Sequence, residues 1–163
     1  MLGGSSIRSQ MKIWFKDHYY RTKMRSRPPK AEIIRLVERV LIKMGERSAE
    51  VGVVLTGDAE IQRLNRQYRR MDQPTDVLAF ALREDSFTPQ PRGLHRHLLG
   101  DVVISVPTAR KQATEQGHSL EQEIAVLIIH GLLHLMGYDH ERSPVAARAM
   151  KRKERELFRA VYG

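Results

Sequence analysis

The segment HGLLHLMGYDH, from His130 to His140, constrains this chain more than any other part of its sequence. His130 and His134 are four residues apart, so on an α-helix they lie on the same face, one turn from each other. Gly137 can adopt a left-handed conformation at little steric cost, which would end the helix and turn the chain back. We therefore expect His140 to return toward the two helical histidines, so that three imidazoles converge on one point.

Three converging imidazoles predict a metal site. Without a metal, ring nitrogens buried together would lack hydrogen-bond partners, at a cost of roughly 1–3 kcal/mol each. The spacing H-x-x-x-H-x-x-G-x-x-H is similar to the one with which metzincin proteases hold zinc. Closed structural zinc sites usually have four protein ligands and favour cysteine, whereas three histidines leave a position for water. We therefore predict one catalytic zinc ion bound by His130, His134 and His140.

The residue after the first histidine separates this chain from those proteases. Metzincins carry a glutamate there as general base, whereas this chain has Gly131. Three neutral imidazoles leave the charge of the ion uncancelled, so its bound water can reach a pKa of about 7 without that base. An anionic substrate would also be attracted to the ion. The missing glutamate therefore favours hydrolysis of a phosphodiester over hydrolysis of a peptide bond.

The overall charge also indicates an anionic partner. The 163 residues include 28 Lys+Arg and 19 Asp+Glu, which gives a formal net charge of +9. Such an excess attracts polyanions, and nucleic acid is the usual candidate, although a solvated basic face is the alternative. The absence of cysteine excludes disulfides, thiolate zinc ligands and a cysteine nucleophile, and it fits a reducing compartment. No apolar run reaches the ~18 residues of a membrane helix, so we expect no membrane association.

The pattern of apolar residues predicts an α+β fold, with a small mixed sheet packed against helices. Apolar, β-favouring runs predict strands, and amphipathic or capped runs predict helices. Ser119 and Gln122 form a capping box, which places the start of the histidine helix near Leu120 and predicts a central buried helix. The predicted strands are 11–15, 51–56, 76–82 and 98–106, and the predicted helices are 31–44, 59–68, 107–116, 120–136 and one from 144 onward.

Two further expectations concern the second helix and the ends of the chain. Asp58 is expected to cap that helix, whose apolar stripe would be Ile61, Leu64 and Tyr68. Residues 1–10 look like a flexible N-terminal extension, and residues 11–163 are predicted to form a single domain.

With these residues in view, the chain resembles the YbeY family of metal-dependent endoribonucleases, also described as rRNA maturation factors. The family signature H-G-x-L-H-L-x-G-Y-D-H is matched throughout by residues 130–140. Residues 64–80 and 99–105 match two further family segments, and the likeness covers roughly residues 33–158. Ala79 is a departure, because the family often has serine there.

The resemblance implies an α+β fold and zinc bound through the three histidines. It also implies cleavage of single-stranded RNA, maturation of the 3′ end of 16S rRNA, and a part in ribosome quality control. The implied partners are rRNA and the small ribosomal subunit, and the implied location is cytoplasmic. Two other functions stay open from the residues alone, namely a zinc peptidase or amidase, and a non-catalytic ribosome-assembly factor.

The resemblance also assigns a functional arginine, Arg69. A guanidinium beside a metal can hold phosphate oxygens in a bidentate pair and stabilise charge in the transition state. The alternative for Arg69 is a salt bridge, with Asp72 as its partner. Arg66, Arg69 and Arg70 cluster at one helix end and are candidates for RNA binding.

Several acidic residues could orient the imidazoles as hydrogen-bond acceptors. The candidates are Asp76 and Asp101, each beside a predicted strand, and Asp139, next to His140; Glu141 could act likewise. The segment Lys16–Lys30 is rich in basic residues. It is interpreted either as a holder of RNA phosphates or as a disordered arm.

Overall fold

The computed structural model describes residues 11–19, 28–82 and 97–162. The expectations for the extension at 1–10 and for most of the basic segment 16–30 fall outside these residues. Among the described helices, none is both long and apolar enough to cross a membrane.

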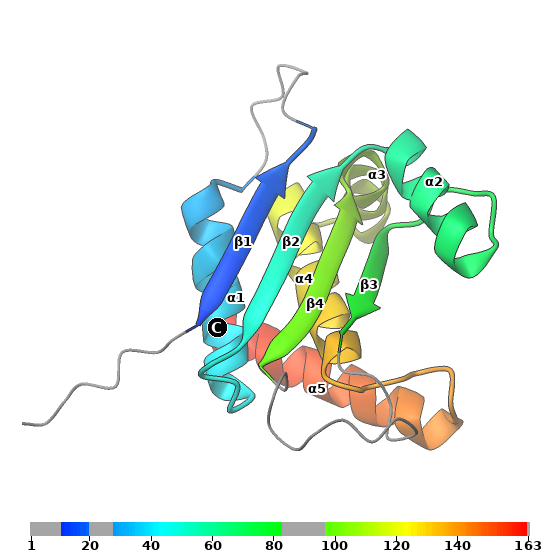
Figure 1. The fold of residues 1–163 in the computed structure, drawn as a ribbon. Helices are drawn as coiled ribbons and strands as arrows, with labels where there is room; N and C mark the ends of the chain where they lie inside the picture. Colours follow the sequence, from blue (N-terminus) through cyan, green and yellow to red (C-terminus); the bar gives the residue numbers. More distant parts are fainter. Residues whose placement is uncertain (1–10, 20–27, 83–96, 163) are drawn as a thin grey trace, which may run out of the picture.

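A four-stranded mixed sheet forms the centre of the fold (Figure 1). Its strands are β1 (Lys12–Asp17), β2 (Glu50–Thr56), β3 (Val77–Ala81) and β4 (Leu98–Ser105), in the order β1-β2-β4-β3. β1, β2 and β4 are parallel, whereas β3 runs antiparallel to β4 at one edge. The prediction of a small mixed sheet packed against helices is confirmed.

The described residues form five helices, most of which lie behind the sheet in Figure 1. They are α1 (Lys30–Lys43), α2 (Asp58–Arg69), α3 (Val106–Gln116), α4 (Leu120–Leu135) and α5 (Pro144–Tyr162). α4 contacts β3 and β4 as well as α1, α3 and α5, and its apolar residues join the main hydrophobic core. α2 lies toward the other face, where Ile61 packs with Leu78 and Val103 in a smaller cluster.

Local capping explains where α4 and α5 begin. Ser119 and Gln122 form both bonds of the predicted capping box at the start of α4. The hydroxyl of Ser143 accepts a hydrogen bond from the amide of Ala146 at 3.0 Å and thereby caps α5, which begins at residue 144 as predicted.

The capping role predicted for Asp58 is wrong. Gly57 occupies the N-cap position of α2, and Asp58 is already inside the helix. Its carboxylate instead accepts hydrogen bonds from the hydroxyls of Ser105, at 2.5 Å, and Thr108, at 2.6 Å. Asp58 therefore joins the start of α2 to the junction between β4 and α3.

Candidate metal centre

Three histidines come together where α4 ends. His130 and His134 lie in the last two turns of α4, and Gly137, at a φ of +99°, lets the chain turn and bring His140 beside them. One nitrogen of each ring lies within 4.8 Å of the other two. The first two rings are partly buried and the third is exposed. The structure thus brings together the three side chains that the sequence predicted to converge.

The nitrogen atoms suit a shared cation. The Nε2 atoms of His130 and His134 lie 3.0 Å apart. Two imidazoles bound to one tetrahedral zinc, with Zn–N distances of about 2.0–2.1 Å, would place their nitrogens roughly 3.3 Å apart. Three nitrogen donors with an exposed side for water are also the donor set of a catalytic zinc site. The residues present therefore fit a zinc ion.

The environment of His134 favours the neutral form of its ring. Burial lowers the pKa of His134, and the neighbouring His130 and His140 lower it further. A hydrogen bond with the backbone of Tyr138 acts in the opposite direction, and the charge of Arg69 again lowers the pKa. Because only a neutral imidazole offers a lone pair to a metal, this shift favours coordination.

Glu154 is a site residue that the sequence analysis missed. Its Oε1 atom lies 2.5 Å from the Nδ1 atom of His130. Because an ionised carboxylate can only accept, the ring must donate from Nδ1, which leaves the lone pair of its Nε2 facing the cluster. The signal was present in α5, where Glu154 is an acidic residue between the buried Met150 and Leu157 on the apolar face.

Gly131 lies where α4 packs closely on the sheet. A Cβ atom at this position would come within 2.6 Å of one methyl of Val102 and 2.9 Å of the other. Val102 is fully buried on β4, so its side chain has no room to move away from a side chain added at position 131. A glutamate at this position would collide with the sheet. The general base of a metzincin therefore has no place in this fold.

We expect Gly131→Ala to lower the free energy of unfolding. The added methyl group overpacks the helix–sheet contact, which typically costs about 1–3 kcal/mol. The better helix propensity of alanine returns up to about 1 kcal/mol, so the net effect is destabilising. Urea denaturation followed by circular dichroism measures the difference. Gly45→Ala is no suitable control, because its positive φ adds backbone strain. Ala149→Gly, at an exposed position of α5, reports helix propensity.

Arg69 is the last residue of α2, and side-chain hydrogen bonds join this helix to the loop that follows it. The buried Asn65 donates from Nδ2 to the carbonyl of Gln73 at 2.9 Å, and Arg70 ends the helix in the left-handed conformation. Asp72 accepts from Gln62 at 3.1 Å and lies 3.9 Å from Arg66.

The alternative salt bridge of Arg69 with Asp72 is therefore not the one observed. Arg66 is the partner of Asp72, and Arg69 forms no ion pair with a described residue. The charge of Arg69 makes the smallest of the contributions that lower the pKa of His134. Arg69 is exposed and has no ion-pair partner among the described residues, so its role toward a substrate stays a prediction.

The acidic residues expected to orient the histidines have other partners. Asp76 accepts from its neighbour Val77 at 2.8 Å and from Gln112 at 3.2 Å, which fastens β3 to α3. Asp139 accepts from the amide of Glu141 at 2.9 Å, within the turn.

Asp101 was also expected to orient a histidine, but no hydrogen bond joins it to one within the described residues. Side chains alternate along a strand, and Val102 is the one that faces α4. Asp101 therefore points to the opposite face, where it lies over Gly52 beside Trp14 and Phe80.

Tyr68 was expected in the apolar stripe of α2, but it is 61% exposed. Its ring meets the edge of Phe80 at a centroid distance of 5.1 Å. The smaller hydrophobic cluster ends at Leu64, so the last turn of α2 extends beyond it into solvent. The periodicity of apolar residues could not predict the exposure of Tyr68, because it does not indicate how far along α2 the smaller hydrophobic cluster extends.

Comparisons with known proteins agree with this geometry. The sequence profile of the family described as Endoribonuclease YbeY matches residues 18–162. A protein named Endoribonuclease YbeY from Roseiflexus sp. (strain RS-1) is 50% identical over 69% of this chain and 70% of its own length. A protein of the same name from Geobacter metallireducens is 46% identical over 76% of this chain and 81% of its own length. The solution structure of TM1509 from Thermotoga maritima has a TM-score of 0.59 and 28% identity, and covers 93% of this chain and 89% of that one.

Proposed function

Because the chain belongs to the YbeY family of rRNA-processing endoribonucleases, we propose that it hydrolyses phosphodiester bonds in single-stranded RNA with the help of a bound zinc ion. The observation that carries the proposal is the cluster of three histidines, one nitrogen of each lying within 4.8 Å of the other two. A metal ion held by three neutral imidazoles would keep its positive charge and would therefore suit an anionic substrate.

His130, His134 and His140 would hold the zinc ion, which would act as a Lewis acid and activate a water molecule for attack on phosphorus. Glu154 serves as a positioning residue, because its hydrogen bond fixes the tautomer and orientation of the ring of His130. The exposed side of His140 leaves a path by which an RNA backbone reaches the cluster.

Arg69 would bind the scissile phosphate. Its guanidinium can donate two parallel hydrogen bonds to the non-bridging oxygens and stabilise the charge that builds on them during hydrolysis. Arg66 and Arg70, at the same end of α2, would extend this contact to neighbouring phosphates. Contacts of this kind follow the backbone and carry no sequence preference, so specificity would come from the ribosomal partner.

The biological setting follows from the family. We infer that residues 11–163 act as one domain on the small ribosomal subunit in the cytoplasm. There the protein would mature the 3′ end of 16S rRNA and contribute to ribosome quality control. A peptidase function is disfavoured because Val102 fills the space that a glutamate base would need at Gly131. If the metal had a purely structural role, the protein would bind zinc but would not cleave RNA.

Metal removal tests the proposal. The purified protein should contain about one zinc ion per chain, and it should cut a single-stranded rRNA fragment. A chelator should abolish cleavage, and added zinc should restore it, while an unstructured peptide stays intact throughout. Mass spectrometry of the metal and denaturing gels of the RNA provide the measurements. A folded protein without metal, or RNA cleavage that survives chelation, would show the proposal to be wrong.

A further inference from the structure

Four arginines follow one face of α5. Arg148, Arg152, Arg155 and Arg159 are separated by four, three and four residues, which places them in one row along the helix. At 1.5 Å per residue, the row extends over roughly 16 Å. All four side chains are exposed. We call these four residues the arginine row.

The arginine row is not neutralised by the acidic residues of its own helix. Glu154 is bound to His130, and Glu156 accepts a hydrogen bond from Lys153 at 3.1 Å. Within the described part of the chain, none of the four arginines forms an ion pair. The row therefore presents uncompensated positive charge to solvent.

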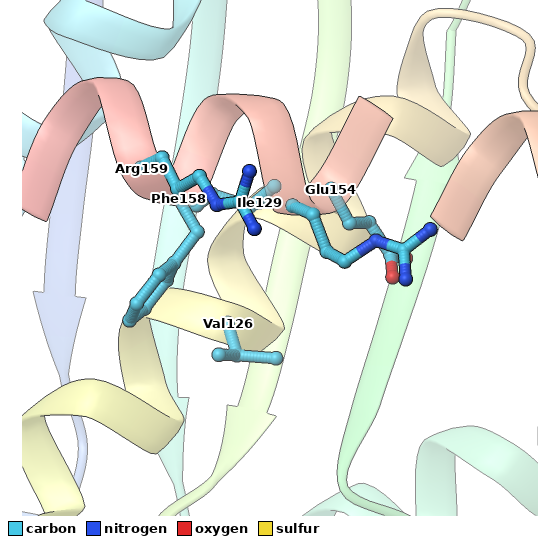
Figure 2. A pocket seen from close by; sticks show the side chains of 6 residues that line it. Val126, Ile129, Glu154, Phe158 and Arg159 are labelled. Atoms are coloured by element: carbon cyan, nitrogen blue, oxygen red, sulfur yellow. The ribbon is translucent and has the colours of Figure 1, made fainter. Parts of the chain in front are cut away.

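A hollow lies beside two residues of the arginine row. It has a volume of about 250 Å³ and lies between α4 and α5, where Phe158 reaches down from α5 toward Val126 (Figure 2). Arg155 and Arg159 border it, and Ile129, the neighbour of His130 in the chain, lines its floor. Glu154 lines the same hollow and is hydrogen-bonded to His130, so one side chain borders both the hollow and the cluster.

We propose that the arginine row binds backbone phosphates of the RNA strand that flanks the bond being cut. This inference rests on the proposed function, because it extends the path of the same substrate along α5. Free guanidinium groups in a row are suited to successive phosphates, and their release of counterions makes binding depend on salt. The apolar lining of the hollow adds a surface for an unpaired base, which a duplex cannot offer.

An anionic membrane is the other polyanionic surface that a basic amphipathic helix can bind. Such helices insert their apolar face between the lipids. In α5 that face is already occupied, because Met150 and Leu157 are buried in the main core and α5 contacts α1 and α4. The structure thus favours RNA over a lipid surface.

The test compares two double variants with the same change in charge. Arg152→Gln/Arg155→Gln removes the middle of the row, and Lys43→Gln/Lys111→Gln removes two exposed lysines from α1 and α3. Fluorescence anisotropy with a labelled single-stranded RNA gives the Kd over a series of salt concentrations. Denaturing gels verify that the RNA stays intact during each titration, and duplex RNA and anionic phosphatidylserine vesicles serve as further probes.

The arginine variant should bind single-stranded RNA roughly tenfold more weakly, and the slope of log K against log salt should fall by about 1.4, or 0.7 per lost contact. The lysine variant should keep the slope of the parent protein, and duplex RNA should bind more weakly than the single strand. Equal losses in the two variants, or vesicle binding that only the arginine variant loses while its RNA binding persists, would overturn the proposal. If the parent binds RNA through the row but cuts none, the proposed function fails and the arginine row stands.

Discussion

Replacing His134 by alanine is expected to abolish both retention of zinc and cleavage of RNA. His134 lies between the other two histidines, with its Nε2 atom 3.0 Å from that of His130. Loss of a residue that merely orients a ligand typically costs 10–100-fold in metal affinity, so loss of the ligand itself should cost more than about 100-fold. Metal analysis after gel filtration and an RNA cleavage assay measure the two effects.

A graded variant separates coordination from folding. Glu154→Gln keeps all three histidines but weakens the acceptor for His130, so the affinity for zinc should fall by about 10–100-fold. Excess zinc should therefore restore cleavage in Glu154→Gln and fail to restore it in His134→Ala. Circular dichroism should show the same helix content in both proteins. If His134→Ala still bound zinc with parent affinity, the three-histidine site would be refuted.

Arg69→Glu is expected to lower the cleavage rate by roughly 10²–10³-fold while zinc stays bound. The estimate comes from the loss of one group that stabilises developing negative charge in other hydrolases. Because Arg69 is exposed and has no ion-pair partner among the described residues, the substitution should leave stability nearly unchanged. Single-turnover cleavage at saturating RNA, with the metal content measured in the same sample, gives the result.

Arg63→Glu on the same helix is the matched control. Arg63 is exposed and is paired with Glu60 at 2.7 Å, so it is not available to a substrate in the same way. Its replacement changes the charge of α2 by the same amount and should lower cleavage only slightly, through weaker attraction of RNA. Equal losses in the two variants would mean that Arg69 contributes general charge and does not hold the phosphate.

The elements of this fold could be predicted from sequence wherever a local signal determined them. The capping box at Ser119 and the glycine turn at Gly137 depend on neighbours within a few residues, so the start of α4 and the return of His140 were both predictable. The mixed sheet followed from the order of its strands. Such signals are read without knowledge of tertiary packing.

The surroundings of the cluster could not be predicted in the same way. The carboxylate that holds His130 comes from Glu154, 24 residues along the chain, and reaches it only because α5 packs on α4. Asp101 was misplaced because strand alternation defines two faces without saying which one the helix will cover. The contact between Gly131 and Val102 shows which face of β4 packs on α4, and this contact exists only in the folded protein.

The hydrogen bond between Glu154 and His130 has a thermodynamic corollary. It couples the packing of α5 on α4 to the binding of a metal ion by the histidines, and each event favours the other by the same factor. A ligand that binds α5 and stabilises its position would therefore increase the affinity of the histidine cluster for the metal ion. Through this coupling, a polyanion bound along α5 would strengthen metal binding at the site that cleaves it.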